Sequence, residues 1–426
     1  MTQVLCHTPT PSAEIEVGLL TGGIDKPYAF GLAMALISND VRVDFIGSDE
    51  VDSPELHASP KLRFLNLRGN QSDEASLSRK IRRVLTYYAR LIRYTSVAGP
   101  KILHILWNNK FEAFDRTLLM LYYRLLGKRI ALTAHNVNAG QRDSNDSPLN
   151  RLTLRIQYRL ANHIFVHTEK MKAELLSDFG IQGHAVTVIP LGINNSAPNT
   201  RLTRAEARQQ LGLSDGDKTI LFFGAIGPYK GLECLITAFQ AVAPRHPGCR
   251  LIIAGKPKVG TEKYLDDVQQ SISQDVTRDR VMQRLEFIPD EETESYFKAA
   301  DVLALPYTEV SQSGVLVLGY SFGLPLVATD VGSLKEEILE GKTGFLCKPG
   351  DPLDLARALD AYFRSDLFEN LESRRQQIRD YGNRLHSWDV VGEKTLQVYA
   401  ELASSRRRGS VRWWPARDAA RTHEAG

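Results

Sequence analysis

One lysine stands where this sequence could bind a phosphate. Residues 222–232 read FFGAIGPYKGL, so an apolar strand ends at Gly224 and Lys230 lies just before the next helix. Free backbone N–H groups and the helix dipole favour an anion at such a helix start, and an ammonium group adds a point charge for a phosphate. A tight turn that carries a solvated lysine explains the same residues as well. This segment alone leaves both interpretations open.

A loop of small residues precedes another helix in the same half of the chain. Residues 310–329 read VSQSGVLVLGYSFGLPLVAT, in which Ser311, Gln312, Ser313 and Gly314 lie between a strand and a helix. Hydroxyls and unpaired amides at a helix start suit a phosphate or the hydroxyls of a sugar. N-capping by Ser311 or Ser313 is the structural alternative. Two such places in one half of the chain favour a ligand site.

A histidine is the third candidate. His135 follows the apolar run RIALT at residues 129–133, which places it at the carboxyl end of a strand, where open α/β sheets bind their ligands. An ordinary hydrogen-bonded histidine is the alternative. Asp143 and Asp146, in the segment RDSNDS, could imitate a metal loop, but a solvated loop is the favoured interpretation. No metal site is predicted.

Alternating strands and helices must position these residues, a pattern typical of parallel, doubly wound sheets. In the first half the expected strands are residues 15–20, 41–46, 101–106, 129–133 and 163–166, with a helix over 28–36. In the second half they are 219–223, 250–254, 284–287, 302–305 and 326–328, with helices over 232–242, 291–300 and 314–322. The predicted fold class is α/β, with two facing Rossmann-like domains and a cleft between them.

A polar stretch after residue 193 separates the two patterns and indicates a linker. The predicted parts are an N-terminal domain at 1–193, a linker at 194–218, a C-terminal domain at 219–385, a helix at 386–403 and a tail at 404–426. The tail is basic and has no apolar periodicity, so we expect it to be poorly ordered.

Composition narrows the class of protein. The chain has 426 residues, 43% hydrophobic and 24% charged, which suits two globular domains and excludes a disordered or fibrous protein. The net charge of +3 gives no sign of nucleic-acid binding. Four widely spaced cysteines indicate neither a disulfide framework nor a zinc site. No signal peptide or membrane span is predicted, so we expect a cytoplasmic protein whose membrane contact is at most peripheral.

Seven motifs in this order resemble glycosyltransferase family 4, and the resemblance covers about residues 15–403. They are TGG (21–23), TAHNV (133–137), IPLGI (189–193), FFGAIGPYKGL (222–232), SQSGV (311–315), FGLPLVATDVGSLKE (322–336) and GKTGFL (341–346).

The resemblance implies the GT-B architecture and a retaining, metal-independent hexosyltransferase that uses a nucleotide-diphosphate sugar and no other cofactor. It implies that Lys230 binds the diphosphate, that Gly22 and Gly23 approach it from the N-terminal domain, and that His135 lies near the transferred sugar. The leaving phosphate is expected to take the acceptor's proton. The remaining donor-binding candidates are Gly224, Glu309, Ser311, Gln312, Ser313, Gly314 and Glu336.

The sequence also departs from the family pattern. Ala225 stands where an arginine is common, and the second of two usual glutamates is Leu318, while the first falls on Val310 unless a one-residue shift brings in Glu309. The resemblance is therefore to the subset that carries SQSGV instead of the glutamate pair. A non-catalytic relative that binds a sugar nucleotide as a scaffold or regulatory subunit is the alternative, and an epimerase or phosphorylase on the same fold is a third interpretation.

A basic segment suggests where the acceptor binds. Residues 75–111 contain eight Lys or Arg and no Asp or Glu. On a helix, Arg79, Arg82, Arg83, Arg90 and Arg93 share one face, opposite Ile81, Val84, Leu85, Tyr88, Leu91 and Ile92.

We expect the apolar stripe to pack inward and the arginines to attract an anionic membrane or a lipid diphosphate. In the tail, Arg406, Arg407, Arg408 and Arg412 beside Trp413 and Trp414 offer a second membrane patch, with a plain basic tail as the alternative. The expected acceptor is a glycan or a polyprenyl-lipid-linked glycan, in the synthesis of a cell-surface polysaccharide or glycolipid.

Overall fold

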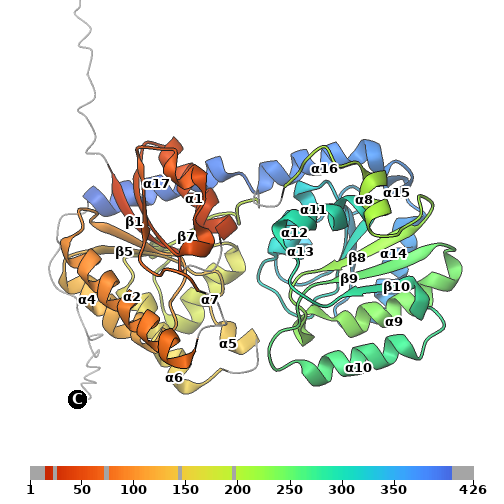
Figure 1. The fold of residues 1–426 in the computed structure, drawn as a ribbon, viewed down its shortest axis with the longest axis horizontal. Helices are drawn as coiled ribbons and strands as arrows, with labels where there is room; N and C mark the ends of the chain where they lie inside the picture. Colours follow the sequence, from red (N-terminus) through yellow and green to blue (C-terminus); the bar gives the residue numbers. More distant parts are fainter. Residues whose placement is uncertain (1–14, 23–25, 72–75, 143–145, 194–197, 405–426) are drawn as a thin grey trace, which may run out of the picture.

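The computed structural model describes residues 15–22, 26–71, 76–142, 146–193 and 198–404. They form two α/β lobes that lie side by side (Figure 1). The structure confirms the predicted fold class, since each lobe is built around one parallel sheet with helices on both faces.

The N-terminal lobe contains a parallel sheet in the order β3-β2-β1-β4-β5-β6-β7. Its strands are β1 (Glu16–Leu20), β2 (Arg42–Gly47), β3 (Leu62–Asn66), β4 (Ile102–Ile105), β5 (Arg129–Thr133), β6 (His163–Val166) and β7 (Val186–Val188). The central strands are buried along almost their whole length, because helices cover both faces of the sheet.

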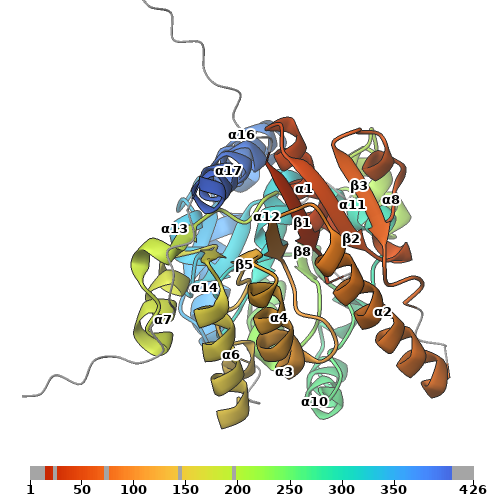
Figure 2. The ribbon, with the colours of Figure 1, turned by 90° about the vertical axis from the view of Figure 1, so that its left-hand side faces the viewer.

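The helices of this lobe are α1 (Lys26–Ser38), α2 (Leu77–Val97), α3 (Glu112–Phe114), a π turn η3 (Asp115–Leu119), α4 (Met120–Leu125), α5 (Ala139–Arg142), α6 (Pro148–Leu160), α7 (Glu169–Phe179) and α17 (Trp388–Ser404). Helices α1 and α17 pack together on one face of the sheet, and α2, α4 and α6 lie on the other (Figure 2).

The C-terminal lobe repeats the plan with a parallel sheet in the order β10-β9-β8-β11-β12-β13. Its strands are β8 (Lys218–Phe223), β9 (Cys249–Ala254), β10 (Val281–Arg284), β11 (Val302–Leu305), β12 (Leu326–Thr329) and β13 (Gly344–Cys347). Its helices are α8 (Arg204–Gln210), η5 (Pro228–Lys230), α9 (Leu232–Val242), α10 (Glu262–Ser273), α11 (Asp290–Ala299), α12 (Gly314–Ser321), α13 (Leu334–Glu337), α14 (Pro352–Phe363), α15 (Asp366–Glu369) and α16 (Leu371–Leu385).

Most expected elements agree with the structure to within one or two residues, and β5, β6, β11 and α9 agree at both ends. The strand expected at 284–287 was wrong, because β10 ends at Arg284 and is only partly buried at the edge of the sheet. Strands β3, β7 and β13 were not predicted. All three are short and partly exposed, so they lack the continuous apolar run that marks a buried strand.

The segment predicted as linker, 194–218, includes an ordered helix. Helix α8 begins with a capping box in which Thr203 and Glu206 satisfy each other's backbone N–H groups. On this helix Arg208 is fully buried and donates to the carbonyl oxygens of Ser214 and Ala299 at 3.2 Å. Much of the predicted linker is therefore part of the C-terminal lobe, and residues 194–197 lie outside the described residues.

The outer face of α2 differs from the sequence-based expectation. Tyr88 and Leu91 are buried as expected, but Ile81 and Leu85 are 52% and 60% exposed, and Ile92 is also exposed. The expectation that this whole stripe packs inward was wrong for these three residues. The first turns of α2 extend past the neighbouring helices (Figure 2), whereas Ile92 lies near the other end of this helix.

The chain crosses twice between the lobes, and one tryptophan lies where the crossings meet. The indole of Trp388, at the start of α17, occupies the space beside Gly31 of α1 and Gly192 of the first crossing. Its Nε1 donates to the carbonyl oxygen of Ile193 at 2.9 Å, and its ring lies 5.4 Å from that of Tyr28. Although α17 follows the C-terminal lobe in sequence, it packs on α1 of the N-terminal lobe.

We expect Gly31→Ala to lower the free energy of unfolding by about 1–3 kcal/mol, because the added methyl overlaps the Trp388 indole. Helix propensity alone would predict the opposite sign, a gain of about 1 kcal/mol. Gly183→Ala is the matched control, since its methyl would meet only Leu176 Cδ2 at 3.8 Å. Urea unfolding of both variants measures the difference, and equal stability would show that the indole has room to move.

Candidate active site

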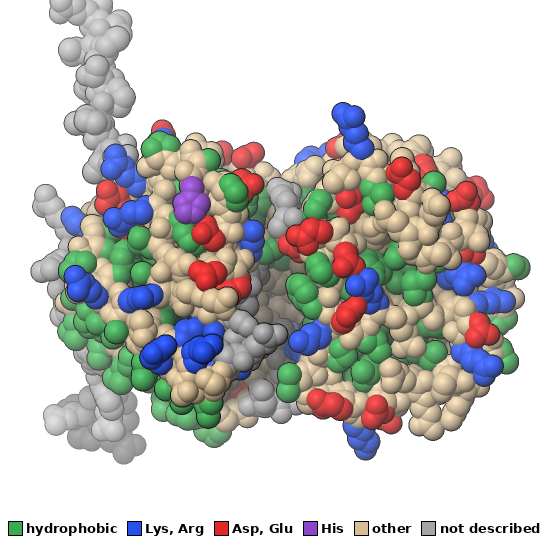
Figure 3. All heavy atoms as spheres, in the orientation of Figure 1, with side chains coloured by type: hydrophobic (Ala, Val, Ile, Leu, Met, Phe, Trp, Pro, Cys, Tyr) green, Lys and Arg blue, Asp and Glu red, His purple; other side chains and the backbone are tan. Residues whose placement is uncertain are grey.

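The candidate residues of both lobes lie at the carboxyl ends of central strands. Gly22 follows β1 and His135 follows β5, while Gly224 follows β8 and the loop at 306–313 follows β11. In each parallel sheet the strand order reverses between two adjacent strands, β1 and β4 in one and β8 and β11 in the other. Open α/β sheets bind ligands at such switch points. The lobes face each other across a furrow (Figure 3).

Lys230 is buried without an acidic partner. Its side chain is only 6% exposed, its Nζ donates to the hydroxyl of Tyr307 at 3.0 Å, and it lies 4.8 Å from the centre of that ring. Among the described residues no carboxylate forms an ion pair with it. An ammonium group in this setting is stabilised when an anion binds beside it, because its charge is otherwise uncompensated.

Two glycines let the backbone turn around this lysine. Gly224 has φ of +97°, and a methyl group there would lie 3.4 Å from the Lys230 Nζ and 3.2 Å from Val315 Cγ2. Gly231 has φ of +63°, and a methyl group there would overlap the carbonyl oxygen of Pro306. The end of β8, the Lys230 amine and the start of α12 are therefore brought together.

The loop before α12 has a structural and a cross-lobe role. The Ser313 hydroxyl accepts from the Leu316 N–H at 3.2 Å, so this serine caps the helix, as in the structural alternative. Gln312 instead crosses the furrow, where its Nε2 donates to the carbonyl oxygen of His135 at 3.3 Å. The Gln312 Oε1 is buried and has no hydrogen-bond partner among the described residues.

His135 lies in a stack of aromatic rings. Its imidazole is parallel to the Trp107 indole at 4.3 Å, and the edge of Tyr28 approaches it at 4.7 Å. A methyl group on Gly22 would come 2.6 Å from Trp107 Cβ, so the TGG motif, the indole and the histidine are layered together. Burial, with a smaller contribution from His167, lowers the pKa of His135 well below its usual value, so the ring is neutral.

Sequence reasoning missed Tyr28, Trp107 and His167. A usable signal existed for two of them, because Trp107 comes two residues after β4 and His167 directly after β6. The rule that selected His135 after β5 selects these residues too. Tyr28 lies on the first turn of α1, and no sequence rule connects that position with the histidine.

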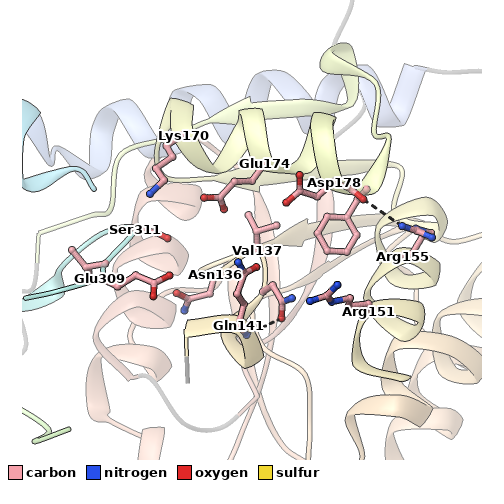
Figure 4. Close-up of a pocket in the computed structure, with 13 residues that line it drawn as sticks. Asn136, Val137, Gln141, Arg151, Arg155, Lys170, Glu174, Asp178, Glu309 and Ser311 are labelled. Carbon is pink, nitrogen blue, oxygen red and sulfur yellow. Dashed lines mark hydrogen bonds between the residues drawn. The ribbon is translucent and has the colours of Figure 1, made fainter. Parts of the chain in front are cut away.

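A polar cavity of about 370 Å³ lies between the lobes beside Asn136, the residue after His135 (Figure 4). Glu309 and Ser311 face it from the C-terminal lobe, while Asn136, Gln141 and the helices α6 and α7 form the opposite wall. Its charged lining residues are Arg151, Arg155, Lys170, Glu174, Asp178 and Glu309. Burial is the largest effect on Glu174 and raises the pKa of its carboxyl group.

The other candidates lie apart from this cavity. Glu336 is exposed on α13 and does not line the cavity, and Gly23 lies outside the described residues. Gly314 begins α12 close to Leu191 of the first crossing. Ala225 is exposed, whereas Leu318 is buried in the core of the C-terminal lobe and packs as an ordinary apolar residue. Across the described ranges, no group of three His, Cys, Asp or Glu residues could hold a metal ion.

Comparisons with known proteins assign the family. The model for "Glycosyltransferase Family 4" matches residues 26–197, and the model for "Glycosyl transferases group 1" matches residues 203–384. The chain belongs to glycosyltransferase family 4. The two matches meet at the first crossing between the lobes, so the family assignment covers both sides of the furrow.

Curated relatives of this family 4 protein include the D-inositol 3-phosphate glycosyltransferase of Corynebacterium urealyticum, 26% identical over 60% of each chain. The enzyme of the same name from Pseudarthrobacter chlorophenolicus is 30% identical over 56% of each chain. The chain thus spans roughly 60% of the length of these relatives.

Solved structures extend the likeness in fold. A sucrose-phosphate synthase from Thermosynechococcus elongatus has a TM-score of 0.71 at 19% identity and covers 92% of this chain and all of its own. Anabaena HepE, crystallised with UDP and glucose, has a TM-score of 0.69 at 17% identity over 91% of this chain and all of its own. These likenesses show a shared GT-B fold.

Lys230→Met should leave the stability of the ligand-free protein unchanged or raise it by about 1 kcal/mol, because an uncompensated buried charge is replaced by an apolar chain of similar length. Lys298→Met is the control. Lys298 pairs with the buried Glu294, so its loss should cost about 1–3 kcal/mol. Urea unfolding of both variants tests this contrast, and a large loss in Lys230→Met would assign that lysine a structural role.

Proposed function

We propose that this protein is a retaining glycosyltransferase that moves a hexose-type sugar from a nucleotide diphosphate to a glycan or lipid-linked acceptor. The observation that carries the proposal is the buried ammonium of Lys230, which has no carboxylate partner among the described residues and lies at a switch point facing the other lobe. Family membership and the UDP named with Anabaena HepE support the same assignment.

The proposed chemistry depends on stabilising the leaving group. As the bond between the sugar and the diphosphate breaks, negative charge grows on the phosphate and the sugar becomes oxocarbenium-like. Lys230 and the backbone amides near Gly224 and Gly314 would bind that phosphate, and the proposal gives no role to a metal ion. The acceptor hydroxyl would attack from the same face, and the leaving phosphate oxygen would take its proton, so the anomeric configuration is retained.

Ligand-induced stabilisation tests the donor site. The protein is screened by thermal shift against UDP, GDP, ADP and their common sugar conjugates. A ligand at 100 times its Kd should add about 2.7 kcal/mol of stability. We expect one nucleotide class to stabilise the wild type and to lose this effect in Lys230→Ala.

Lys101→Ala is the control for that screen, because Lys101 is exposed at the amino end of β4, the end of the sheet away from the candidate site. Stabilisation that survives in Lys230→Ala would contradict the assigned phosphate site. Binding of a sugar nucleotide without transfer to any glycan or lipid-linked acceptor would favour a non-catalytic relative instead.

We further propose that the acceptor is presented at an anionic membrane surface. Residues 76–160 hold 16 Lys and Arg and 4 Asp and Glu, a formal charge of +12, although the whole chain carries +3. Arg79, Arg82, Arg83 and Arg90 line one hollow of about 260 Å³ beside residues 67–70, and Arg93 does not line it. The predicted basic tail lies outside the described residues.

Exposed apolar side chains accompany this charge. They occur on α2, on η3 and α4, and on α6, and these helices are neighbours, since Tyr122 of α4 donates to the Ile92 carbonyl oxygen and Arg116 of η3 donates to Asn150 of α6. The side chains are Ile81, Leu85, Leu118, Leu121, Leu125, Leu149 and Leu152. Figure 3 shows hydrophobic side chains beside Lys and Arg on the lower part of this lobe. Apolar groups among cations suit an anionic bilayer surface.

The described residues include no helix long and apolar enough to cross a bilayer. Membrane contact of the described chain would thus be at the surface, and its strength would depend on lipid charge and on the exposed apolar residues. This contact is proposed for the whole enzyme and does not require the tail.

Vesicle flotation tests this contact. The protein should float with anionic vesicles and remain in the soluble fraction with neutral ones. The double variant Ile81→Asn and Leu85→Asn should bind anionic vesicles more weakly by about 2 kcal/mol, or roughly thirtyfold, because both side chains lose apolar burial in the bilayer.

Leu353→Asn is the control, since Leu353 is even more exposed, at 76%, but lies on α14 of the other lobe. It should float like the wild type. Failure of the wild type to bind either kind of vesicle would remove the membrane proposal and leave the donor site untouched.

A further inference from the structure

His135 has a hydrogen-bond partner on only one side of its ring. Its Nδ1 lies 3.1 Å from Nε2 of His167, the residue after β6. Its Nε2 is buried and has no hydrogen-bond partner among the described residues. The Trp107 indole stacks on one face at 4.3 Å and Tyr28 approaches at 4.7 Å, so this packing holds the plane of the ring.

The hydrogen bonds of His167 determine which nitrogen of His135 carries the proton. The Nδ1 of His167 lies 3.2 Å from the carbonyl oxygen of Ile189. A carbonyl oxygen only accepts, so this Nδ1 must carry a hydrogen. In a neutral ring the Nε2 of His167 then has a free lone pair and accepts from the Nδ1–H of His135. The Nε2 of His135 is left without a hydrogen.

Both rings are neutral near pH 7. Burial lowers the pKa of His167 to about 4 and that of His135 well below its usual value. An added proton would turn the acceptor Nε2 of His167 or of His135 into a donor. The neutral state of both rings therefore keeps the hydrogen bonds that link Ile189, His167 and His135 in a single direction.

We propose that His167 is a positioning residue that holds His135 in the Nδ1–H tautomer, so that the bare Nε2 of His135 accepts a hydroxyl hydrogen of the transferred sugar. This inference rests on the proposed function and adds the chemistry by which the sugar is recognised. A bare nitrogen can pair with a hydroxyl, which donates, but not with a phosphate oxygen, which accepts.

The two sides of the furrow would then recognise different parts of the donor. The Lys230 ammonium selects the anionic diphosphate, and the neutral His135 selects a hydroxyl on the sugar. A sugar without that hydroxyl would leave the buried nitrogen unpaired, which is the strongest basis on which a polar site rejects an analogue. His167 itself is assigned no contact with the substrate, because its Nε2 already pairs with Nδ1 of His135.

The first experiment observes the tautomer directly. The full-length protein is labelled with ¹⁵N-histidine, and two-bond proton–nitrogen correlation spectra distinguish protonated from bare ring nitrogens of His135. The wild type should show the Nδ1–H form alone. His167→Phe, which keeps an aromatic ring but cannot accept, should show the Nε2–H form as well. His167→Gln, whose amide oxygen can accept at the Nε2 position, should restore the Nδ1–H form.

The second experiment measures the consequence for binding, with UDP and UDP-glucose as the probes and the GDP and ADP pairs beside them. We expect His167→Phe to lower the affinity for the sugar nucleotide about tenfold and to leave the affinity for the nucleotide diphosphate unchanged. His167→Gln should recover most of the lost affinity. The ratio of the two affinities separates this effect from general damage to the fold, because misfolding weakens the binding of both ligands.

Three outcomes would overturn the proposal. In the first, His135 keeps the Nδ1–H form alone in His167→Phe. In the second, the affinities for the nucleotide and for the sugar nucleotide fall equally. In the third, the tautomer changes but the affinity for the sugar nucleotide does not. If no wild-type nucleotide complex forms, the proposed function fails, and the spectra still decide whether His167 sets the tautomer.

Discussion

The packing of the Trp388 indole is the interaction on which the arrangement of the two lobes depends. The two crossings between the lobes meet at this indole, which is possible because Gly31 and Gly192 have no side chains there. His386 and Trp388 bond to the carbonyl oxygens of Leu191 and Ile193, so each crossing holds the other. Packing around this indole therefore links the two crossings between the lobes.

The packing around Trp388 extends to the candidate site. Trp388 lies against Tyr28, and Tyr28 lies against His135, so the aromatic rings run from the crossing to the histidine without a gap. Gln312 reaches the backbone of His135 from the other lobe. A change in the angle between the lobes would move these contacts together. The same rings hold His135 in the position where its Nε2 has no hydrogen-bond partner among the residues that the structure describes.

The two lobes contribute opposite kinds of polar group. The C-terminal lobe offers a buried ammonium without an acidic partner among the described residues, and the N-terminal lobe offers neutral imidazoles whose charged forms are suppressed by burial. His135 Nε2 and Gln312 Oε1 have no hydrogen-bond partner among the described residues, and the Lys230 amine bonds only to the neutral Tyr307 hydroxyl there, so each of these groups costs stability in the free protein. Such groups persist where a ligand satisfies them, and all three lie at the furrow.

The sequence by itself determined the parts of this protein that follow from local pattern. Apolar runs bounded by glycine and polar residues set the strands, and the preference of helix starts for anions selected Lys230 and the loop at 311–314. The rule that ligands bind at the carboxyl ends of parallel strands selected His135. Only the tertiary structure decided which faces are covered. Ile81 and Leu85 fit an inward stripe by periodicity, yet they are exposed, because periodicity defines a face of a helix and not what packs against it. The roles of Tyr28, His167 and Trp388 were equally hidden, since ring contacts and proton positions arise between residues far apart in the chain.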